Sequence, residues 1–169
     1  MSMYHASVPV FVQMLTNLSA ILDKAAAHAE AKKFDSANFL GMRLIADMLP
    51  LARQVQIACD HAKRATARLA GVEPPKHPDE EKSIDELKAR IASVLDYLKT
   101  FKPAQIDGSE MKEISFPGGG STRSYKGRQM LLHYTYPNFF FHVTTAYDIL
   151  RSSGVDIGKA DFAANAPAA

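Results

Sequence analysis

Apolar residues recur at alternating spacings of three and four along one stretch of the chain, and this repeat constrains the fold more than any other feature. The positions are Leu44, Met48, Leu51, Val55, Ala58, Ala62, Ala65 and Leu69. Such a repeat places one apolar stripe along a helix and is typical of a seam in a helix bundle. We predict a helix from just after Phe34-Asp35-Ser36 to Leu69, ended by Gly71. Because Pro50 removes a backbone donor, this helix should be kinked near Ala46.

Two further stretches carry the spacing or the boundary signals of helices. The first helix should span residues 7–31, with a serine N-cap and apolar residues at helical spacing. Ser83 and Glu86 form a capping box, in which each side chain accepts from the backbone amide of the other residue. The third helix should therefore begin at Ser83, pair Glu86 with Arg90 on its outer face, and end before Pro103.

A short β-hairpin is predicted before the last helix. Residues 111–116 and 121–125 flank Pro117-Gly118-Gly119-Gly120 in the pattern of two strands around a turn. The last helix should have two parts, residues 127–134 and residues 137–154, because a proline at position 137 suits a first helical turn. Together these signals predict an all-α fold, an antiparallel four-helix bundle with a small hairpin excursion.

The chain should form one domain. Its 169 residues suit a single hydrophobic core, and no repeat of solenoid length occurs. We assign residues 1–162 to the bundle domain and the alanine-rich residues 163–169 to a flexible C-terminal tail. Residues 72–82 are rich in proline and charge, so we predict an exposed crossover there, with His77 as a surface residue.

Charge and cysteine content favour a soluble cytoplasmic protein. Twenty Lys and Arg oppose 18 Asp and Glu, which gives a net charge of +2, and the basic residues are interspersed with acidic ones. We therefore expect neither nucleic acid nor a membrane as a partner. No apolar run approaches the roughly 18 residues of a membrane span. The single cysteine, Cys59, excludes an intrachain disulfide and fits a reducing compartment.

Two stretches of the chain resemble a known family. One runs from Arg43 to Ile57, and the other is Pro-Asn-Phe-Phe-Phe-His-Val-Thr-Thr-Ala-Tyr at residues 137–147, followed by Leu150-Arg151 and Gly154. Over residues 3–162 the chain resembles a bacterial and fungal family of unassigned function in the DinB/YfiT-like group of four-helix proteins. Many members of that group bind a divalent metal through three histidines, one on the second helix and two on the last.

The resemblance implies a three-residue site. His61 takes the place of the ligand on the second helix, and Asn138 and His142 take the places of the pair on the last helix. Positions 138 and 142 are about one turn apart, so both side chains project from one face. The ion would be zinc or nickel, for which the Asn138 amide is a much weaker ligand than imidazole. The alternative is a hydrogen-bonded pair of histidines that only closes the top of the core.

Aromatic residues on and before the last helix have two interpretations. They are Tyr134, Tyr136, Phe139, Phe140, Phe141 and Tyr147. They could line an aromatic ligand pocket or a subunit interface, or they could pack in the core. We include Tyr147 with His61, Asn138 and His142 in the predicted ligand cleft.

The residues next to His61 are expected to be structural. Asp60 can pair with Arg64 one turn later, although it could instead orient an imidazole as a hydrogen-bond acceptor. Cys59 is close to His61 in sequence, but neighbouring positions on a helix diverge, so the thiol cannot form the hydrogen bond that nucleophilic catalysis requires. The glycines around Gly119 lack the spacing of a phosphate loop and are read as a turn.

Two functional hypotheses follow. The leading one is a DinB-like bundle, non-catalytic or weakly active, that binds a small ligand or a partner in the cleft near His61 and His142, as a homodimer. The alternative is a divalent-metal-dependent hydrolase or thiol-dependent transferase that uses the same cleft, as the group implies, with His61 and His142 as ligands and Asn138 completing or orienting the site. A structural metal site is a third possibility.

Overall fold

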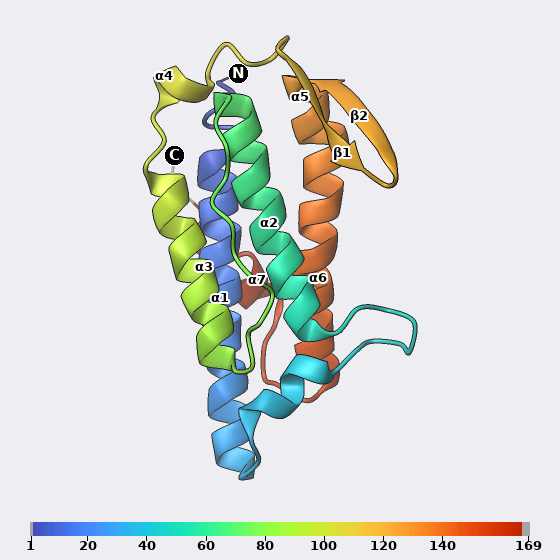
Figure 1. Ribbon diagram of the computed structural model, residues 1–169. Coiled ribbons are helices and arrows are strands. Elements are labelled where there is room, and N and C mark those ends of the chain that lie inside the picture. Colours follow the sequence, from blue (N-terminus) through green and yellow to red (C-terminus); the bar gives the residue numbers. More distant parts are fainter. Residues whose placement is uncertain (1, 167–169) are drawn as a thin grey trace.

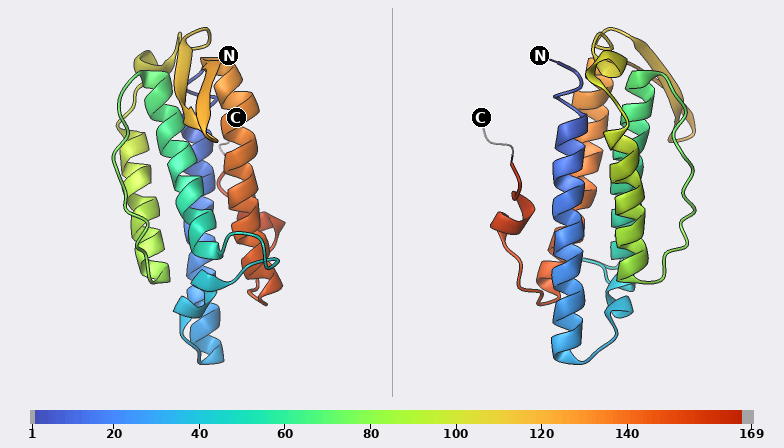
Figure 2. Two further views of the ribbon diagram at one scale, coloured as in Figure 1. Left: turned by 45° about the vertical axis from the view of Figure 1, so that its right-hand side comes forward. Right: turned by 90° about the vertical axis from the view of Figure 1, so that its left-hand side faces the viewer.

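Four long helices form the bundle in this computed structural model, which describes residues 2–166 (Figure 1). They are α1 (Val8–Lys32), α2 (Leu51–Ala70), α3 (Ile84–Lys99) and α6 (Tyr136–Ser152). Helix α1 packs antiparallel to α3, and α2 packs antiparallel to α6. Helices α2 and α3 point the same way, because the segment between them runs back along the bundle (Figure 2). The predicted all-α antiparallel bundle is confirmed.

Shorter elements connect and close the bundle. They are η1 (Ser36–Gly41), α4 (Pro103–Ile106), β1 (Glu113–Gly118), β2 (Ser121–Lys126), α5 (Gly127–Gln129), η2 (Met130–Thr135) and α7 (Lys159–Phe162). Strands β1 and β2 pair antiparallel with Phe116 opposite Arg123, so the predicted hairpin is confirmed. Its turn uses Gly119 and Gly120 at φ 63° and 80°, a left-handed conformation that favours glycine.

The core lies where the apolar stripes of the long helices meet. Its buried side chains include Phe11, Leu15, Leu18, Leu22, Val55, Ala58, Ala62, Leu69, Leu87, Ile91, Val94, Val143, Ala146 and Leu150. Phe11 of α1 meets Phe139 of α6 edge to face, with ring centroids 5.0 Å apart. Most of the positions predicted from helical spacing are therefore buried, and aromatic contact adds to the stabilisation from apolar burial.

The prediction that the second helix begins after Ser36 and bends near Ala46 is wrong. Pro50 is the N-cap of α2 with ψ 167°, and residues 42–50 form a loop after η1. Leu44, which the repeat placed on the seam, is 41% exposed. Proline has no amide hydrogen and disfavours helical backbone in the residue before it, so here it starts a helix instead of bending one.

Of the two hydrogen bonds in the predicted capping box at the start of α3, the structure contains one. The Ser83 hydroxyl accepts from the Glu86 amide at 3.1 Å, as expected. The Glu86 carboxylate accepts from the amide of Lys82 instead of that of Ser83. Both bonds satisfy backbone donors near the helix start, so the cap still fixes where α3 begins.

The last helix is continuous and contains one π-helical segment. Helix α5 passes into η2, and η2 passes directly into α6, so the two predicted parts join. Pro137 lies in the first turn of α6, as predicted, and Gly154 follows the helix at φ 90°. A π-turn inserts an extra residue into a helix and changes which side chains face its neighbours, which matters here because Tyr134 lies in η2.

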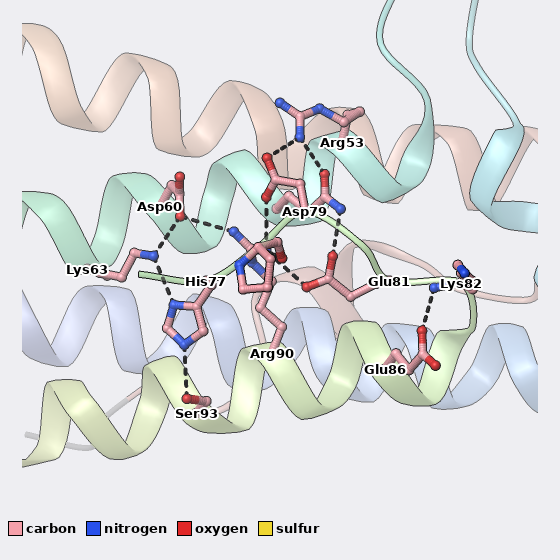
Figure 3. Close-up of polar contacts among 12 residues, drawn as sticks. Arg53, Asp60, Lys63, His77, Asp79, Glu81, Lys82, Glu86, Arg90 and Ser93 are labelled. Atoms are coloured by element: carbon pink, nitrogen blue, oxygen red, sulfur yellow. Dashed lines mark hydrogen bonds and ion pairs between the residues drawn. The ribbon is translucent and has the colours of Figure 1, made fainter. Parts of the chain in front are cut away.

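Residues 72–82, which we call the strap, are held against α2 and α3 by buried charges (Figure 3). Arg90 of α3 is 4% exposed. Its guanidinium donates to Glu81 at 2.9 Å and to the Pro78 carbonyl at 3.0 Å, and it pairs with Asp79 at 3.0 Å and with Asp60 at 3.1 Å. The predicted exposed pairing of Glu86 with Arg90 is therefore wrong, because the returning strap buries the arginine.

A second contact anchors the strap through His77. The Nδ1 atom of His77 lies 2.9 Å from Nζ of Lys63 on α2, and Nε2 lies 3.0 Å from the Ser93 hydroxyl on α3 (Figure 3). Because lysine only donates, Nδ1 accepts and Nε2 carries the hydrogen. His77 is half-buried and links two helices, so the prediction of a surface role for it is wrong.

The C-terminal segment runs back along α1 (Figure 2). Asp161 of α7 pairs with Lys24 at 2.6 Å. Within the predicted tail, the Ala164 carbonyl accepts from Gln13 at 2.9 Å and from Asn17 at 2.8 Å. Residues 167–169 of that tail lie outside the described residues. Within residues 2–166, no helix combines the length and the apolar character that crossing a membrane requires.

Candidate functional site

The structure brings His61 and His142 together across the α2/α6 interface. Their ring centroids are 6.0 Å apart, and the ring planes differ by 17°. Both side chains are half-buried. They meet because His61 follows the apolar seam positions of α2 and His142 precedes the buried Val143 on α6, where the two antiparallel helices pack.

A buried glutamine fixes the orientation of the His142 ring. The Nδ1 atom of His142 lies 2.7 Å from Oε1 of Gln54 on α2. The amide of Gln54 donates in turn from Nε2 to the Leu49 carbonyl at 2.9 Å, which turns its oxygen toward His142. Nδ1 of His142 therefore carries the hydrogen and Nε2 keeps its lone pair.

Both imidazoles are neutral at pH 7. Burial, and after it the charges of His142, Arg64 and Arg68, lower the pKa of His61 to about 4. Burial also lowers the pKa of His142 below its ordinary value. A neutral imidazole has one N–H donor and one lone pair, so the pair can hydrogen bond to a ligand from two rings.

Asn138 lies one turn before His142 on α6 and is half-buried. Its Nδ2 atom donates to the Tyr134 carbonyl, 2.6 Å away. This bond gives the amide nitrogen a structural partner and leaves Oδ1 as the group that could face a ligand. Asn138 is thereby linked to Tyr134, whose ring centroid is 5.8 Å from that of His61.

Tyr147, which the sequence placed in the same cleft, lies in a different part of the molecule. Its ring packs edge to face on Phe162 of α7, with centroids 5.9 Å apart. It lines a separate cavity of about 180 Å³ together with Thr144 and Lys159. Tyr147 is nine residues after Asn138 on the helix, so its side chain points to another face, and the return of α7 covers it.

A small cavity opens beside His61, between α2, the strap and the hairpin. Its volume is about 230 Å³, and it is lined by Arg53, Ile57, Asp60, His61, Arg64, Arg68, Asp79, Pro117 and Tyr134. The hairpin forms one wall, because Phe116 of β1 packs against Tyr134 with ring centroids 5.2 Å apart. Larger hollows of about 410 and 580 Å³ flank the strap, but neither contains His61 or His142.

Gln54, Arg68 and Tyr134 belong to this site; the first two were not predicted to, and Tyr134 was named only among the aromatic residues that could line a ligand pocket. For two of them the sequence held a signal, because Gln54 precedes His61 by seven residues and Arg68 follows it by seven. Seven residues are almost two helical turns, so all three side chains lie on one face of α2. Tyr134 had no such signal, since its direction depends on the π-turn and on the hairpin.

Asp60 supports the fold and does not orient an imidazole. It pairs with Lys63 at 2.9 Å, with Arg64 at 2.7 Å as predicted, and with Arg90 at 3.1 Å. Cys59 beside it is fully buried, and burial raises its pKa to about 12. The thiol therefore stays protonated and is inert as a nucleophile at pH 7.

The donor set does not fit a three-histidine metal centre. Two imidazoles and the amide oxygen of Asn138 fall one strong ligand short of the three that catalytic zinc requires. Across residues 2–166, no group of three or more His, Cys, Asp or Glu side chains is placed to hold a metal ion.

The bundle, its long crossover and the histidines on its second and last long helices define the chain as a DinB-like four-helix protein. It is similar to a DinB family member protein from Shewanella denitrificans, whose crystal structure matches with a TM-score of 0.91 and 45% sequence identity, over 98% of this chain and 94% of that chain. The family described as "Domain of unknown function (DUF1993)" matches residues 3–163, and the chain belongs to this family. No curated protein matches the chain.

Proposed function

We propose that this protein binds a small ligand in the cleft that His61 and His142 form between α2 and α6, with Asn138 at its border. The observation that carries this proposal is the half-buried pair of neutral imidazoles, with ring centroids 6.0 Å apart, of which His61 lines an open cavity. His61 offers an N–H donor and a lone pair, and His142 offers the lone pair of Nε2, so the two rings can make directed hydrogen bonds in a partly desolvated place, which is how small-molecule sites orient ligands.

We place binding without catalysis first. A base with a pKa of about 4, such as His61, accepts protons weakly at pH 7. Cys59 is buried and protonated, so it offers no nucleophile. The carboxylate of Asp60 is paired with Lys63 and Arg90, so it is not free to act as a base.

One observation favours the alternative, a metal-dependent hydrolase or thiol-dependent transferase. The Gln54 amide accepts from Nδ1 of His142 and leaves Nε2 free, and this is the orientation that a supporting residue gives to a metal ligand. The weak third donor, Asn138, argues against that alternative.

Ligand-observed NMR with a library of small neutral, cationic and anionic compounds tests the proposal. Compounds that bind the wild-type protein should no longer bind the His61→Leu and His142→Leu variants, while they still bind His133→Ala, which changes an exposed histidine outside the cleft. Circular dichroism checks that each variant is folded. An identical set of bound compounds in all four proteins, or no bound compound at all, would overturn the proposal.

Metal analysis of protein purified without a histidine tag separates the two candidate functions. We expect no stoichiometric metal and a melting temperature that added zinc or nickel leaves unchanged. Stoichiometric zinc or nickel that disappears in His142→Ala would reverse the order of the two functions and put the metal-dependent alternative first.

A further inference from the structure

The cavity beside His61 carries an excess of positive charge. Three cations line it, namely Arg53, Arg64 and Arg68, against the two carboxylates Asp60 and Asp79. Asp79 pairs with Arg53 and Asp60 pairs with Arg64, so neither carboxylate is left to neutralise the third cation. Three cations and two anions leave an excess of one positive charge in a partly enclosed place.

Arg68 is the cation without a carboxylate. In the part of the chain that the structure describes, its guanidinium makes no ion pair and no hydrogen bond to another side chain. Its central carbon lies 3.6 Å from the centroid of the Phe116 ring, so the aromatic face holds the guanidinium in place. Glu73 lies near enough to affect the pKa of Arg68 but forms no ion pair with it. Stacking leaves the N–H donors at the guanidinium edge free for a ligand.

Three residues of α2 that carry N–H donors line the same cavity. Arg64 and Arg68 follow His61 by three and seven residues, so the three side chains share one face of the helix. Arg64 contacts Asp60 through one terminal nitrogen at 2.7 Å and keeps its other donors. The volume of about 230 Å³ corresponds to the share of about eight liquid waters. This is room for a compact charged group and the part of a small ligand next to it.

We propose that this cavity binds the anionic group, a phosphate or a carboxylate, of a small molecule, and that Arg68 and Arg64 hold it. The guanidinium fork matches both oxyanions, because each presents paired oxygens to parallel N–H donors. His61 lines the same cavity and contacts the next part of the same ligand. The inference rests on the proposed function, since it names the chemical class of the ligand for that cleft.

The test uses four probes: inorganic phosphate, phenyl phosphate, and the pair benzoate and neutral benzamide, which have nearly the same shape and differ in charge. Binding is followed by two-dimensional NMR, including the Nε–H signals of the arginines, with sodium chloride as the competing salt. We expect the anions to bind and to shift the Arg68 signal, and benzamide to leave it unchanged. Affinity should fall as salt rises. The phosphates and benzoate distinguish between a phosphate and a carboxylate as the preferred group.

Substitutions make the test specific. Arg68→Gln should weaken anion binding about ten-fold or more, since it removes hydrogen bonds between charged partners. Arg68→Lys should recover part of the affinity, because it restores the charge without the planar fork. Arg128→Gln is the control, since Arg128 is an exposed arginine of α5 that does not line the cavity. Equal anion affinity in wild type and Arg68→Gln would overturn the inference, as would benzamide binding as tightly as benzoate.

The two proposals fail in different ways. If neutral compounds bind and are lost in His61→Leu, the cleft is a ligand site but its ligand is not an anion. If anions bind through Arg68 and are unaffected by both His61→Leu and His142→Leu, the anion site is real and the proposed histidine cleft is wrong.

Discussion

The Nδ1 atom of His142 lies 2.7 Å from the Oε1 atom of Gln54, and this contact joins α6 to α2 beside the candidate site. Gln54 is 1% exposed, so its amide has no water to replace a lost partner. The bond therefore holds the ring of His142 in one orientation and one tautomer, and the position of the histidine pair depends on a residue that faces no ligand.

Replacing Gln54 should disturb both the fold and the histidine ring. In Gln54→Leu we expect a loss of about 1–2 kcal/mol in the free energy of unfolding, because the Leu49 carbonyl and His142 lose buried hydrogen bonds. NMR of the imidazole nitrogens should show a mixture of tautomers at His142. Gln129→Leu, at an exposed position, is the control. A variant with wild-type stability and a single tautomer would contradict this role.

Removing the buried arginine should loosen the strap. We expect Arg90→Met to lower the free energy of unfolding by about 3 kcal/mol, because Asp60, Asp79 and Glu81 lose their shared partner. Arg151→Met, which removes an exposed arginine 3.9 Å from Asp156, should cost no more than about 1 kcal/mol. Urea unfolding measures both. Trypsin should also cut the strap faster in Arg90→Met, and an uncut strap would contradict the anchoring role.

The strap should weaken in mild acid because of His77. Its pKa is lowered by burial first and then by the cations Lys63 and Arg90, although Asp60 and Glu81 oppose this. The unfolded chain therefore binds a proton more readily than the folded one, and the free energy of unfolding should fall as the pH drops below the ordinary histidine value of 6.5.

Urea unfolding at several pH values between about 7.5 and 5 checks this prediction, because this range spans the pKa of free histidine, roughly 6.5. The fall in stability should be smaller in His77→Gln than in the wild type. His133→Gln, which alters an exposed histidine, should behave like the wild type. If the free energy of unfolding depends on pH equally in His77→Gln and wild type, protonation of His77 does not cause the loss of stability.

Gly127 should not tolerate a side chain. A Cβ atom at this position would lie 2.0 Å from the backbone oxygen of Ser109, which cannot rotate away. Gly127→Ala should therefore lower the free energy of unfolding by about 1–3 kcal/mol, as overpacked substitutions do. A Cβ atom at Gly158 would meet no atom within 4 Å, so Gly158→Ala is the matched control. Equal melting temperatures for the two variants would refute the prediction.

The homodimer remains a proposal, and exposed apolar side chains support it. Leu44, Ile45 and Leu49 in the loop before α2 are 41%, 61% and 45% exposed, and Phe141 on α6 is 54% exposed. We expect light scattering at micromolar concentration to give twice the chain mass of 18.5 kDa. Ile45→Ser should lower that mass, whereas Met111→Ser, at another exposed apolar position, should leave it unchanged. A monomeric wild type would end the proposal.

Part of the fold was predictable because it depends on neighbours within a turn or two. The Ser83 cap needs only the amide of Glu86, and the turn at Gly119-Gly120 needs only residues that accept positive φ. The same local physics explains the main error. The apolar repeat continues through Leu44, but Pro50 ends helical backbone regardless of the pattern around it.

Part of the candidate site was predictable for a similar reason. Helical spacing places positions 138 and 142 on one face, and the family resemblance suggested that His61 faces them. The contact between His61 and His142 is present, with centroids 6.0 Å apart. The position of Tyr147 was not predictable from helical spacing, because it depends on α7 folding back so that Phe162 packs on its ring.

The amino-acid sequence by itself determined the helices, their apolar stripes and most of their ends, since these follow from spacing and capping along the chain. Only the tertiary structure decided what surrounds His61. The strap and the hairpin come from residues distant in sequence, and they bury Arg90 among carboxylates and stack Phe116 under Arg68. Burial and charge balance depend on which distant segments meet, and no local pattern encodes that meeting.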